Sequence, residues 1–434
     1  MPEPPPVVMS ATLAADEALA RRRRAGEQIV SLASGEIGLP VLPELRERLG
    51  AAAFRNAYGP VAGSAELRAA AAGYWTRRGL ATVPEQVVCG PGSKPLLFAL
   101  LLAVGGDPVV PAPSWVSYAA QARLAGGVPL PVPTPPGEGG VPDPDALRAE
   151  VTAARAAGRD PRCVVVTTPD NPTGTIPSAA TMRRLAEAAR ELDLVVVSDE
   201  IYTDLVFDPA DHAHSPALDA PERTVVTTGL SKSLALGGWR IGVARLPGGS
   251  AGRALRTRLT GIASQIWSST PAPVQAAAAW AFTEPPEVTA YAAAARRLHA
   301  TVASAVARRF TDAGATLSPV RATCYLFPDF EPLRGSLAGS WDVHDGAALT
   351  ALFADRYGIG LLPGAAFGDA PGALRVRAAT ARLYGETDGE RQTALDAPDP
   401  LRLPWIGAAL DRLDTALAGL AGASPARLRG AAAP

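Results

Sequence analysis

A lysine placed directly after a buried strand is the residue of this sequence with the plainest chemical use. Residues 224–228 form a short run of threonine and valine, which is typical of a buried strand, and Lys232 follows it closely. Eight residues further on, Arg240 stands between a tryptophan and an isoleucine. A lysine amine forms imines with carbonyl compounds, and burial lowers its pKa until it can serve as a nucleophile or base. The segment therefore indicates carbonyl chemistry with a second cation nearby.

An anion site is indicated by residues 87–94, which read Val-Val-Cys-Gly-Pro-Gly-Ser-Lys. This pattern predicts a strand, a glycine turn and the first residues of an apolar helix, and N–H groups at a helix N-terminus bind anions. Gly92, Ser93 and Lys94 are therefore candidate phosphate ligands. The segment is not a Walker A loop, because Pro95 follows the lysine where that motif has serine or threonine. A single phosphate group is expected rather than a nucleotide.

Further polar and aromatic side chains follow other apolar runs. Trp115, Asn171 and Asp199 each come at or just after the end of such a run, and Tyr202 comes three residues after Asp199. Apolar runs of this length are typical of parallel strands covered on both faces, and open α/β sheets bind ligands at the carboxyl ends of their strands. A carboxylate at the end of a buried strand is costly without a cation beside it, so Asp199 indicates a cationic partner.

The elements that must position these residues alternate between strand and helix from residue 60 to residue 245, which predicts an α/β fold. Residues 271–310 are alanine-rich and predict helices with a break at residues 284–286. A chain of 434 residues is long enough for two or three domains.

Charge and composition exclude several classes of function. The formal net charge is −1, so nothing favours nucleic acid or an anionic membrane as a partner. Residues 96–104, the longest apolar run, are too short to span a bilayer, which needs about 20 residues. Cys89, Cys163 and Cys324 form neither a disulfide framework nor a zinc pattern, and residues 1–6 lack a signal-peptide pattern, which favours a cytoplasmic location. The four histidines show no ligand spacing, so no metal is expected.

Taken in order, these segments resemble the motifs of the class I/II aminotransferases, which are fold-type I enzymes that depend on pyridoxal 5'-phosphate (PLP). The motifs are Tyr-Gly-Pro at 58–60, Asn-Pro-Thr-Gly at 171–174, Asp-Glu-Ile-Tyr at 199–202, Ser-Lys at 231–232 and Gly-Trp-Arg-Ile-Gly at 238–242. The resemblance covers about residues 10 to 420. It implies an aspartate-aminotransferase-like fold, with a large PLP-binding domain at residues 46–285 that has a mostly parallel central sheet covered by helices. Residues 1–45 and 286–434 would form a smaller α/β domain from both chain ends.

The resemblance gives each candidate residue around the cofactor ring a role. Lys232 is expected to be the Schiff-base lysine and the general base. Asp199 would keep the pyridine nitrogen protonated, and Tyr202 and Asn171 would hydrogen-bond the ring oxygen. Trp115 would stack on the ring.

The same resemblance implies how the phosphate is held. Ser231, Arg240 and the backbone of residues 92–94 would bind it, together with Tyr58 of the partner subunit. The protein is therefore expected to be a homodimer with shared active sites.

The substrate site is expected to use Gly35, Asn171 and Arg375. Arg375 and Arg377 are two residues apart, so both project to the same face of an extended strand. Residues 375–380, Arg-Val-Arg-Ala-Ala-Thr, align with the family's Arg-Leu-Ser-x-Ala-Thr, which places Arg375 at the substrate carboxylate.

The implied reaction moves the amino group of an α-amino acid to an α-keto acid by a ping-pong route. A neutral substrate side chain is expected, because the helix after the phosphate segment offers no cation and Cys324 is uncharged. Elimination at the β or γ carbon and oxygen-dependent oxidation use the same motifs and are the alternatives. A PLP-binding regulator is disfavoured, since no DNA-binding segment is predicted before residue 10. The Pro/Asp-rich insertion at 383–403 leaves the substrate side chain open.

Overall fold

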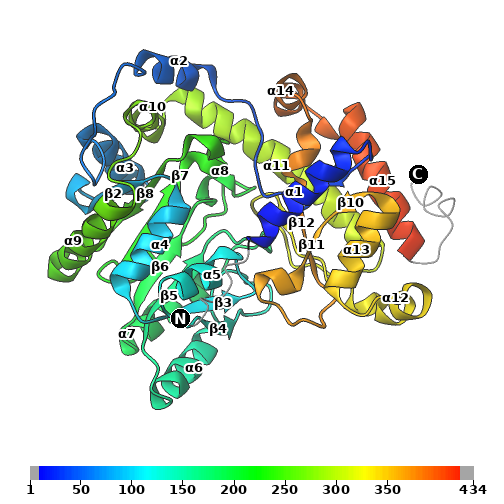
Figure 1. Cartoon of the computed structure of the whole chain (residues 1–434), viewed down its shortest axis with the longest axis horizontal. Helices are drawn as coiled ribbons and strands as arrows, with labels where there is room; N and C mark the ends of the chain where they lie inside the picture. The colour runs from blue at the N-terminus through cyan, green and yellow to red at the C-terminus, as the bar shows by residue number, and fades with distance from the viewer. Residues whose placement is uncertain (1–8, 421–434) are drawn as a thin grey trace, which may run out of the picture.

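The computed structural model describes residues 9–420, and Figure 1 shows two groups of elements side by side. The larger group is built on a seven-stranded sheet with the order β2-β8-β7-β6-β5-β3-β4. Its strands are β2 (Val87–Gly90), β3 (Asp107–Ala112), β4 (Leu130–Pro133), β5 (Pro161–Thr167), β6 (Val195–Asp199), β7 (Thr224–Gly229) and β8 (Gly242–Arg245). Strand β8 is antiparallel to both neighbours, and the other pairings in this sheet are parallel. This confirms the predicted mostly parallel central sheet.

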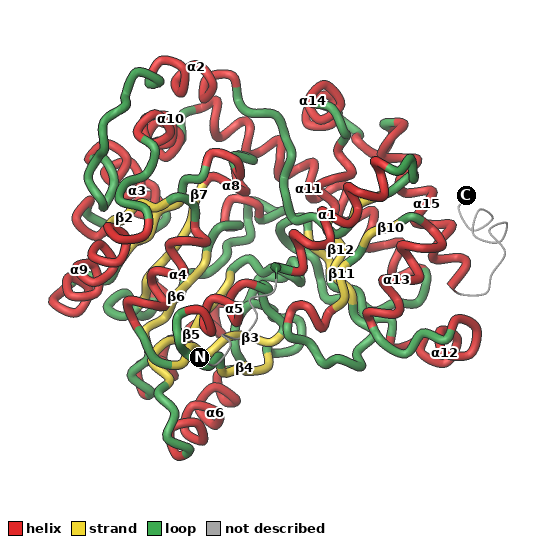
Figure 2. Tube along the Cα trace, in the orientation of Figure 1, coloured by secondary structure: helices red, strands yellow, loops and turns green. Residues whose placement is uncertain are grey.

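Helices cover both faces of the sheet (Figure 2). They are α4 (Ser93–Val104), α5 (Ser117–Leu124) and α9 (Gly249–Ile266) on one face, and α6 (Pro144–Ala156) and α7 (Ala179–Glu191) on the other. On β5, Val165 packs with the first group, whereas Val164 and Val166 pack with the second. Because side chains alternate along a strand, a run of valines is buried on both sides. The packing therefore fixes the carboxyl ends of β5, β6 and β7 at one edge of the sheet.

Another set of helices packs beside the sheet and leads to the smaller group. These are α2 (Pro43–Ala51), α3 (Ala65–Arg77), α8 (Leu230–Ser233), α10 (Ala272–Phe282) and α11 (Pro286–Asp312). The predicted helical region at 271–310 is thus two helices, and the break falls at Glu284, which has a positive φ of 57°. The 27-residue α11 runs from the larger group into the smaller one (Figure 1).

The smaller group combines segments from both ends of the chain. Strand β1 (Val30–Ser31) pairs in parallel with β10 (Ile359–Gly360), and a second sheet has the order β11-β12-β9. The remaining elements are β9 (Tyr325–Leu326), β11 (Leu362–Pro363), β12 (Val376–Ala379), α1 (Ala11–Arg24), α12 (Arg334–Trp341), α13 (Gly346–Tyr357), α14 (Asp388–Asp396) and α15 (Pro404–Leu420). This arrangement supports the division into residues 46–285 and residues 1–45 with 286–434, which stays a prediction. Its first boundary falls inside α2.

The insertion at residues 383–403 is folded and packed. It contains α14 and a 3₁₀ turn, Pro400–Arg402. Tyr384 is buried, its hydroxyl lies 2.5 Å from His299 Nδ1 on α11, and its carbonyl accepts a hydrogen bond from Trp405 Nε1 at 3.1 Å. The insertion therefore braces the end of β12 against α11 and α15.

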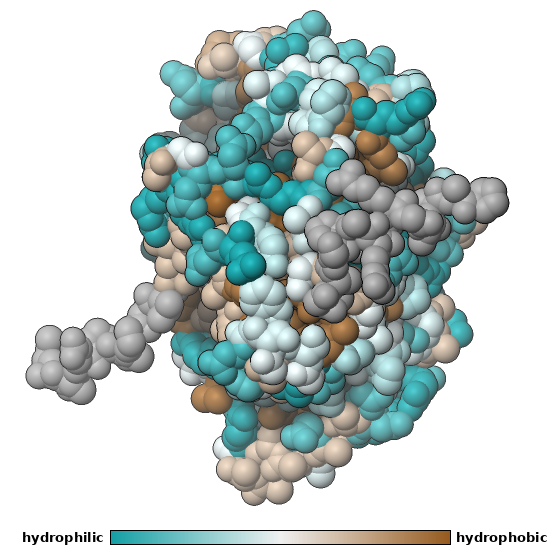
Figure 3. Space-filling view, turned by 90° about the vertical axis from the view of Figure 1, so that its right-hand side faces the viewer, coloured by the Kyte–Doolittle hydropathy of each residue, from teal (hydrophilic) through white to brown (hydrophobic). Residues whose placement is uncertain are grey.

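The surface mixes hydrophilic and hydrophobic residues on the face that Figure 3 shows. Within residues 9–420, none of the helices combines the length and the apolar character needed to cross a membrane.

Candidate active site

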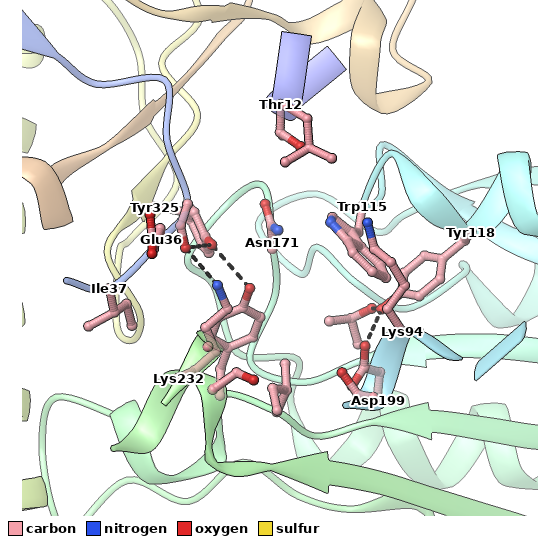
Figure 4. A pocket seen from close by; sticks show the side chains of 18 of the residues that line it. Thr12, Glu36, Ile37, Lys94, Trp115, Tyr118, Asn171, Asp199, Lys232 and Tyr325 are labelled. Atoms are coloured by element: carbon pink, nitrogen blue, oxygen red, sulfur yellow. Dashed lines mark hydrogen bonds between the residues drawn. The ribbon is translucent and has the colours of Figure 1, made fainter. Parts of the chain in front are cut away.

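A cavity of about 520 Å³ lies at the carboxyl ends of β5, β6 and β7 (Figure 4). The predicted site residues that line it are Gly35, Ser93, Lys94, Trp115, Asn171, Asp199, Tyr202, Ser231, Lys232 and Arg240. Figure 4 shows Lys232 and Tyr325 on one side of this cavity, Trp115 and Lys94 on the other, and Asn171 between them. The fold thus gathers segments that are far apart in the sequence.

Lys232 lies in the short helix α8, directly after β7. Its Nζ donates a hydrogen bond to the carbonyl oxygen of Gly35 at 2.6 Å. Burial lowers the pKa of the Lys232 amine, and the charge of Arg377 lowers it further. The amine is therefore more easily uncharged than that of an ordinary lysine, which suits a nucleophile or a base.

Asp199 ends strand β6 and is buried. Tyr118 donates to its Oδ2 at 2.9 Å and Thr227 donates to its Oδ1 at 3.2 Å. Desolvation raises the pKa of Asp199 to about 6, against the effect of these two hydrogen bonds. In the described part of the chain, no side-chain cation forms an ion pair with this carboxylate, so it fits a ligand that brings a cationic ring nitrogen. Tyr118, one turn after Trp115, is a partner that the sequence reasoning missed.

The start of α4 is suited to binding an anion. Gly92 caps this helix with a positive φ of 97°, a backbone angle that residues other than glycine rarely adopt. The turn presents Ser93 and Lys94 to the cavity. Burial lowers the pKa of Lys94, and the positive charge of Arg240 lowers it further. Ser231 lines the same part of the cavity. Two neighbouring cations beside a helix N-terminus fit a phosphate group.

The cavity therefore fits PLP in three independent respects. It offers a buried carboxylate for the ring nitrogen, a cationic cradle for the phosphate, and a lysine amine between them. Trp115 supplies an aromatic face, and its ring lies 5.0 Å from Lys94 Nζ.

The two arginines at the start of the last strand have different surroundings, and these differ from what the alignment predicted. Arg377 is 1% exposed and lines the cavity, and its Nη1 donates to Asn171 Oδ1 at 3.4 Å. Arg375 instead forms ion pairs with Asp329 at 3.1 Å and Asp369 at 2.9 Å, and does not line the cavity. The physical reason is that β12 begins at Val376, so Arg375 lies just before the strand, where the two carboxylates hold its side chain. The structure thus brings Arg377, and not Arg375, to the cavity, whereas which of the two binds the substrate carboxylate stays a prediction.

Several lining residues were not among the predicted ones. They are Thr12, Leu13, Asp16, Glu36, Ile37, Tyr118, Thr167, Ile201, Gly237, Tyr325 and Arg377. Tyr325 bonds Gly35 O at 3.2 Å and Tyr202 Oη at 3.1 Å. A Cβ at position 35 would lie 2.5 Å from the Tyr325 hydroxyl, so the close approach requires glycine there. Of the lining residues, Thr12, Leu13 and Asp16 lie on α1, and no motif in the sequence marks that helix as part of a site.

Tyr58 and Gly92 do not line the cavity of their own chain. Gly92 acts through the turn that presents Ser93. Tyr58 is 91% exposed, which leaves its side chain available to another subunit.

Comparison with known proteins places these features in a family. The family model for aminotransferase class I and II matches residues 27–383. A probable aspartate/prephenate aminotransferase from Thermus aquaticus is 40% identical over 241 residues, which make up 54% of this chain and 61% of that relative. The chain thus spans less than two thirds of that protein. An aspartate/prephenate aminotransferase from Cereibacter sphaeroides is 31% identical over 86% of this chain and 92% of the relative.

A solved structure shares the fold over nearly the whole chain. It is an aspartate aminotransferase from Thermus thermophilus with maleate, which is 30% identical and has a TM-score of 0.77. The match covers 90% of this chain and 96% of that chain. The predicted fold class is confirmed, and so is the cofactor that the sequence predicted. The chain belongs to the class I and II aminotransferases, a family of PLP-dependent enzymes with the type I fold.

Proposed function

We propose that the protein transfers the amino group of an α-amino acid to an α-keto acid by a ping-pong route. The observation that carries this proposal is Lys232, an amine with a lowered pKa inside a cavity that also holds Asp199 and Arg377. These three groups meet the needs of amino-group transfer: a base, a counter-charge for the cofactor ring, and a cation for the substrate.

Lys232 is the proton carrier in this proposal. When bound, PLP supplies a carbonyl carbon that reacts with amines and a ring that accepts electrons from the substrate Cα. Lys232 Nζ takes the proton from Cα, which requires an uncharged amine near neutral pH. Burial favours that state, and the carbonyl of Gly35, 2.6 Å from Nζ, holds the amine in place.

Arg377 is proposed to bind the substrate carboxylate in place of Arg375. Its guanidinium carbon lies 5.0 Å from the ring centre of Tyr325 and 4.9 Å from that of Phe367, so two aromatic rings contact this group. Its Nε is buried without a hydrogen-bond partner in the described residues, so one donor of the planar fork is available. Asn171 accepts from Arg377 through Oδ1, which leaves its amide N–H groups free to donate to the ring oxygen of the cofactor.

We also propose a homodimer in which Tyr58 of the partner subunit completes the phosphate site. The exposure of Tyr58 and of the nearby Phe54, 91% and 79%, supports this proposal. A cytoplasmic location stays a prediction, supported by three cysteines that are free and buried.

The proposal is tested by adding single amino acids to the purified, PLP-loaded protein and recording its absorbance. Transamination is expected to give a lasting change to the pyridoxamine form of the cofactor, reversed by adding a keto acid. Release of keto acid and ammonia without an acceptor would contradict it and indicate elimination or oxidation, which oxygen uptake tells apart.

A further inference from the structure

One wall of the cavity carries two carboxylates. Asp16 lies on α1, and Glu36 follows Gly35 in the segment after β1. Figure 4 shows Thr12 of α1 above the cavity and the strands below it. Nothing in the PLP chemistry described above uses either carboxylate.

Asp16 forms no ion pair with any of the residues that the structure describes. Its only hydrogen-bond partner in residues 9–420 is the Ser34 hydroxyl, which donates to Oδ2 at 3.0 Å. Within the same residues, no arginine, lysine or histidine nitrogen reaches salt-bridge distance from it. Burial raises its pKa, and the more distant charges of Arg382 and Arg377 act in the opposite direction. A half-buried carboxylate that faces a ligand cavity without a counter-charge is suited to a cationic ligand.

Glu36 differs from Asp16 in this respect. It forms an ion pair with Arg382, so its charge is balanced within the protein. Arg382 therefore pairs with Glu36 rather than with Asp16, although its charge still lowers the pKa of Asp16. Of the two carboxylates, Asp16 is therefore the one without an ion pair in residues 9–420.

A second observation sets the direction of the substrate in the cavity. Arg377 is buried, and its Nε has no partner among the described residues, which points to a carboxylate ligand at that end. Leu13 and Ile37 line the cavity near the carboxylate wall and offer apolar surface to a methylene chain. An amino acid held at Arg377 can thus extend an apolar stem toward α1.

From this geometry we infer that the substrate is an amino acid with a cationic side chain, an ammonium or a guanidinium, whose charge is bound by Asp16. The inference rests on the proposed function for the Arg377 end of the site. It replaces the neutral side chain expected from the sequence, which did not include α1 in the site. A dicarboxylate substrate would instead place a second anion against Asp16.

Kinetics of the first half-reaction test the inference. Arginine, ornithine and lysine are added to the PLP-loaded enzyme, with citrulline and norleucine as uncharged counterparts and glutamate as the acidic one. Removing a hydrogen bond to a charged partner costs about tenfold in binding, so kcat/KM should favour arginine over citrulline by about that factor. Asp16→Asn should abolish the preference, because asparagine keeps an oxygen for Ser34 but has no charge. Glu17→Gln, an exposed position on the same helix, should leave it unchanged.

An equilibrium measurement separates this inference from the proposed reaction. Calorimetry with 5-guanidinopentanoate, which has the carboxylate and the cation but no amino group to transfer, is compared with hexanoate. The wild type and Glu17→Gln should bind the guanidino acid about tenfold more tightly than hexanoate. Asp16→Asn should bind the two acids equally. This result would support the inference even if no transamination were observed.

Three outcomes would overturn it. They are equal use of arginine and citrulline by the wild type, a preference for glutamate over every basic amino acid, and an Asp16→Asn variant that retains bound PLP and still prefers the cationic ligand.

Discussion

Arg377 and Asn171 are hydrogen-bonded to each other, Nη1 to Oδ1 at 3.4 Å, although 206 residues separate them in the chain. The contact joins β12 of the smaller group to the loop after β5 of the larger one. The residue proposed to bind the substrate carboxylate is thus in direct contact with the residue proposed to bind the ring oxygen of the cofactor.

Arg377→Ala is therefore expected to impair every amino acid substrate. Loss of a buried partner for a carboxylate costs about 2–5 kcal/mol, which should appear in kcat/KM. Arg375→Ala is the matched control, because this residue lies just before the same strand. Its partly exposed ion pairs with Asp329 and Asp369 are worth about 1 kcal/mol or less in stability, and kcat/KM should change little. Steady-state kinetics of both variants check this, and a crippled Arg375→Ala with an active Arg377→Ala would restore the register expected from the sequence.

Covalent attachment of the cofactor can be assigned without ambiguity, because Lys94 and Lys232 are the only lysines in the sequence. Reduction with borohydride followed by peptide mass spectrometry should place the cofactor on Lys232. Lys232→Ala should bind PLP without a covalent link and have no turnover. Lys94→Ala should keep the covalent link and bind PLP more weakly, since it removes one cation of the phosphate cradle. Labelling of Lys94 in the wild type would refute both assignments.

Asp199 should make the stability of the cofactor-free protein depend on pH. Its folded-state pKa of about 6 lies above its unfolded value of about 3.9, so the folded protein binds the extra proton between these values. Stability due to this group is present below about pH 4 and is lost as the pH rises through about 6. Asp199→Asn should therefore raise the free energy of unfolding at pH 8 by on the order of 2 kcal/mol and have little effect at pH 4.

Denaturant titrations at the two pH values measure this effect. Asp193→Asn, an exposed aspartate just before β6, is the control and should have no such dependence. With PLP bound, Asp199→Asn should instead lower the free energy of unfolding at pH 8, because the cationic ring nitrogen then balances the carboxylate of the wild type. A cofactor-free Asp199→Asn that is less stable than the wild type at pH 8 would contradict the unpaired state of this group.

Shared active sites can be tested by mixing two inactive variants. If Tyr58 serves the partner subunit, a hybrid of Tyr58→Ala with Lys232→Ala has one site that contains both native residues. Random exchange makes half of the dimers hybrids with one of two sites intact, so about a quarter of the wild-type activity should return. No recovery in subunits shown to have exchanged would place Tyr58 in its own chain's site or outside it.

The sequence by itself determined the cofactor chemistry. Lys232, Asp199 and Asn171 stand at or after the ends of strands whose all-apolar character already shows burial on both faces. In a parallel sheet such strand ends must share one edge, so local patterns were enough to bring these residues together. The glycine turn before α4 is equally local, because the positive φ of Gly92 and the free N–H groups of the helix are properties of that segment.

The substrate end of the site was decided only by the tertiary structure. Arg375 and Arg377 have the same local pattern. Which of them enters the cavity depends on where β12 begins and on the carboxylates of Asp369, six residues before Arg375, and of Asp329, which is 46 residues away. Asp16 carries no signal of its own, since a carboxylate on an amphipathic helix is ordinarily solvated. It becomes part of the site because β1 pairs with β10 and the folded chain ends place α1 over the cavity. Local patterns report what a segment can do, whereas side chains contributed by non-local packing depend on contacts that a sequence pattern does not contain.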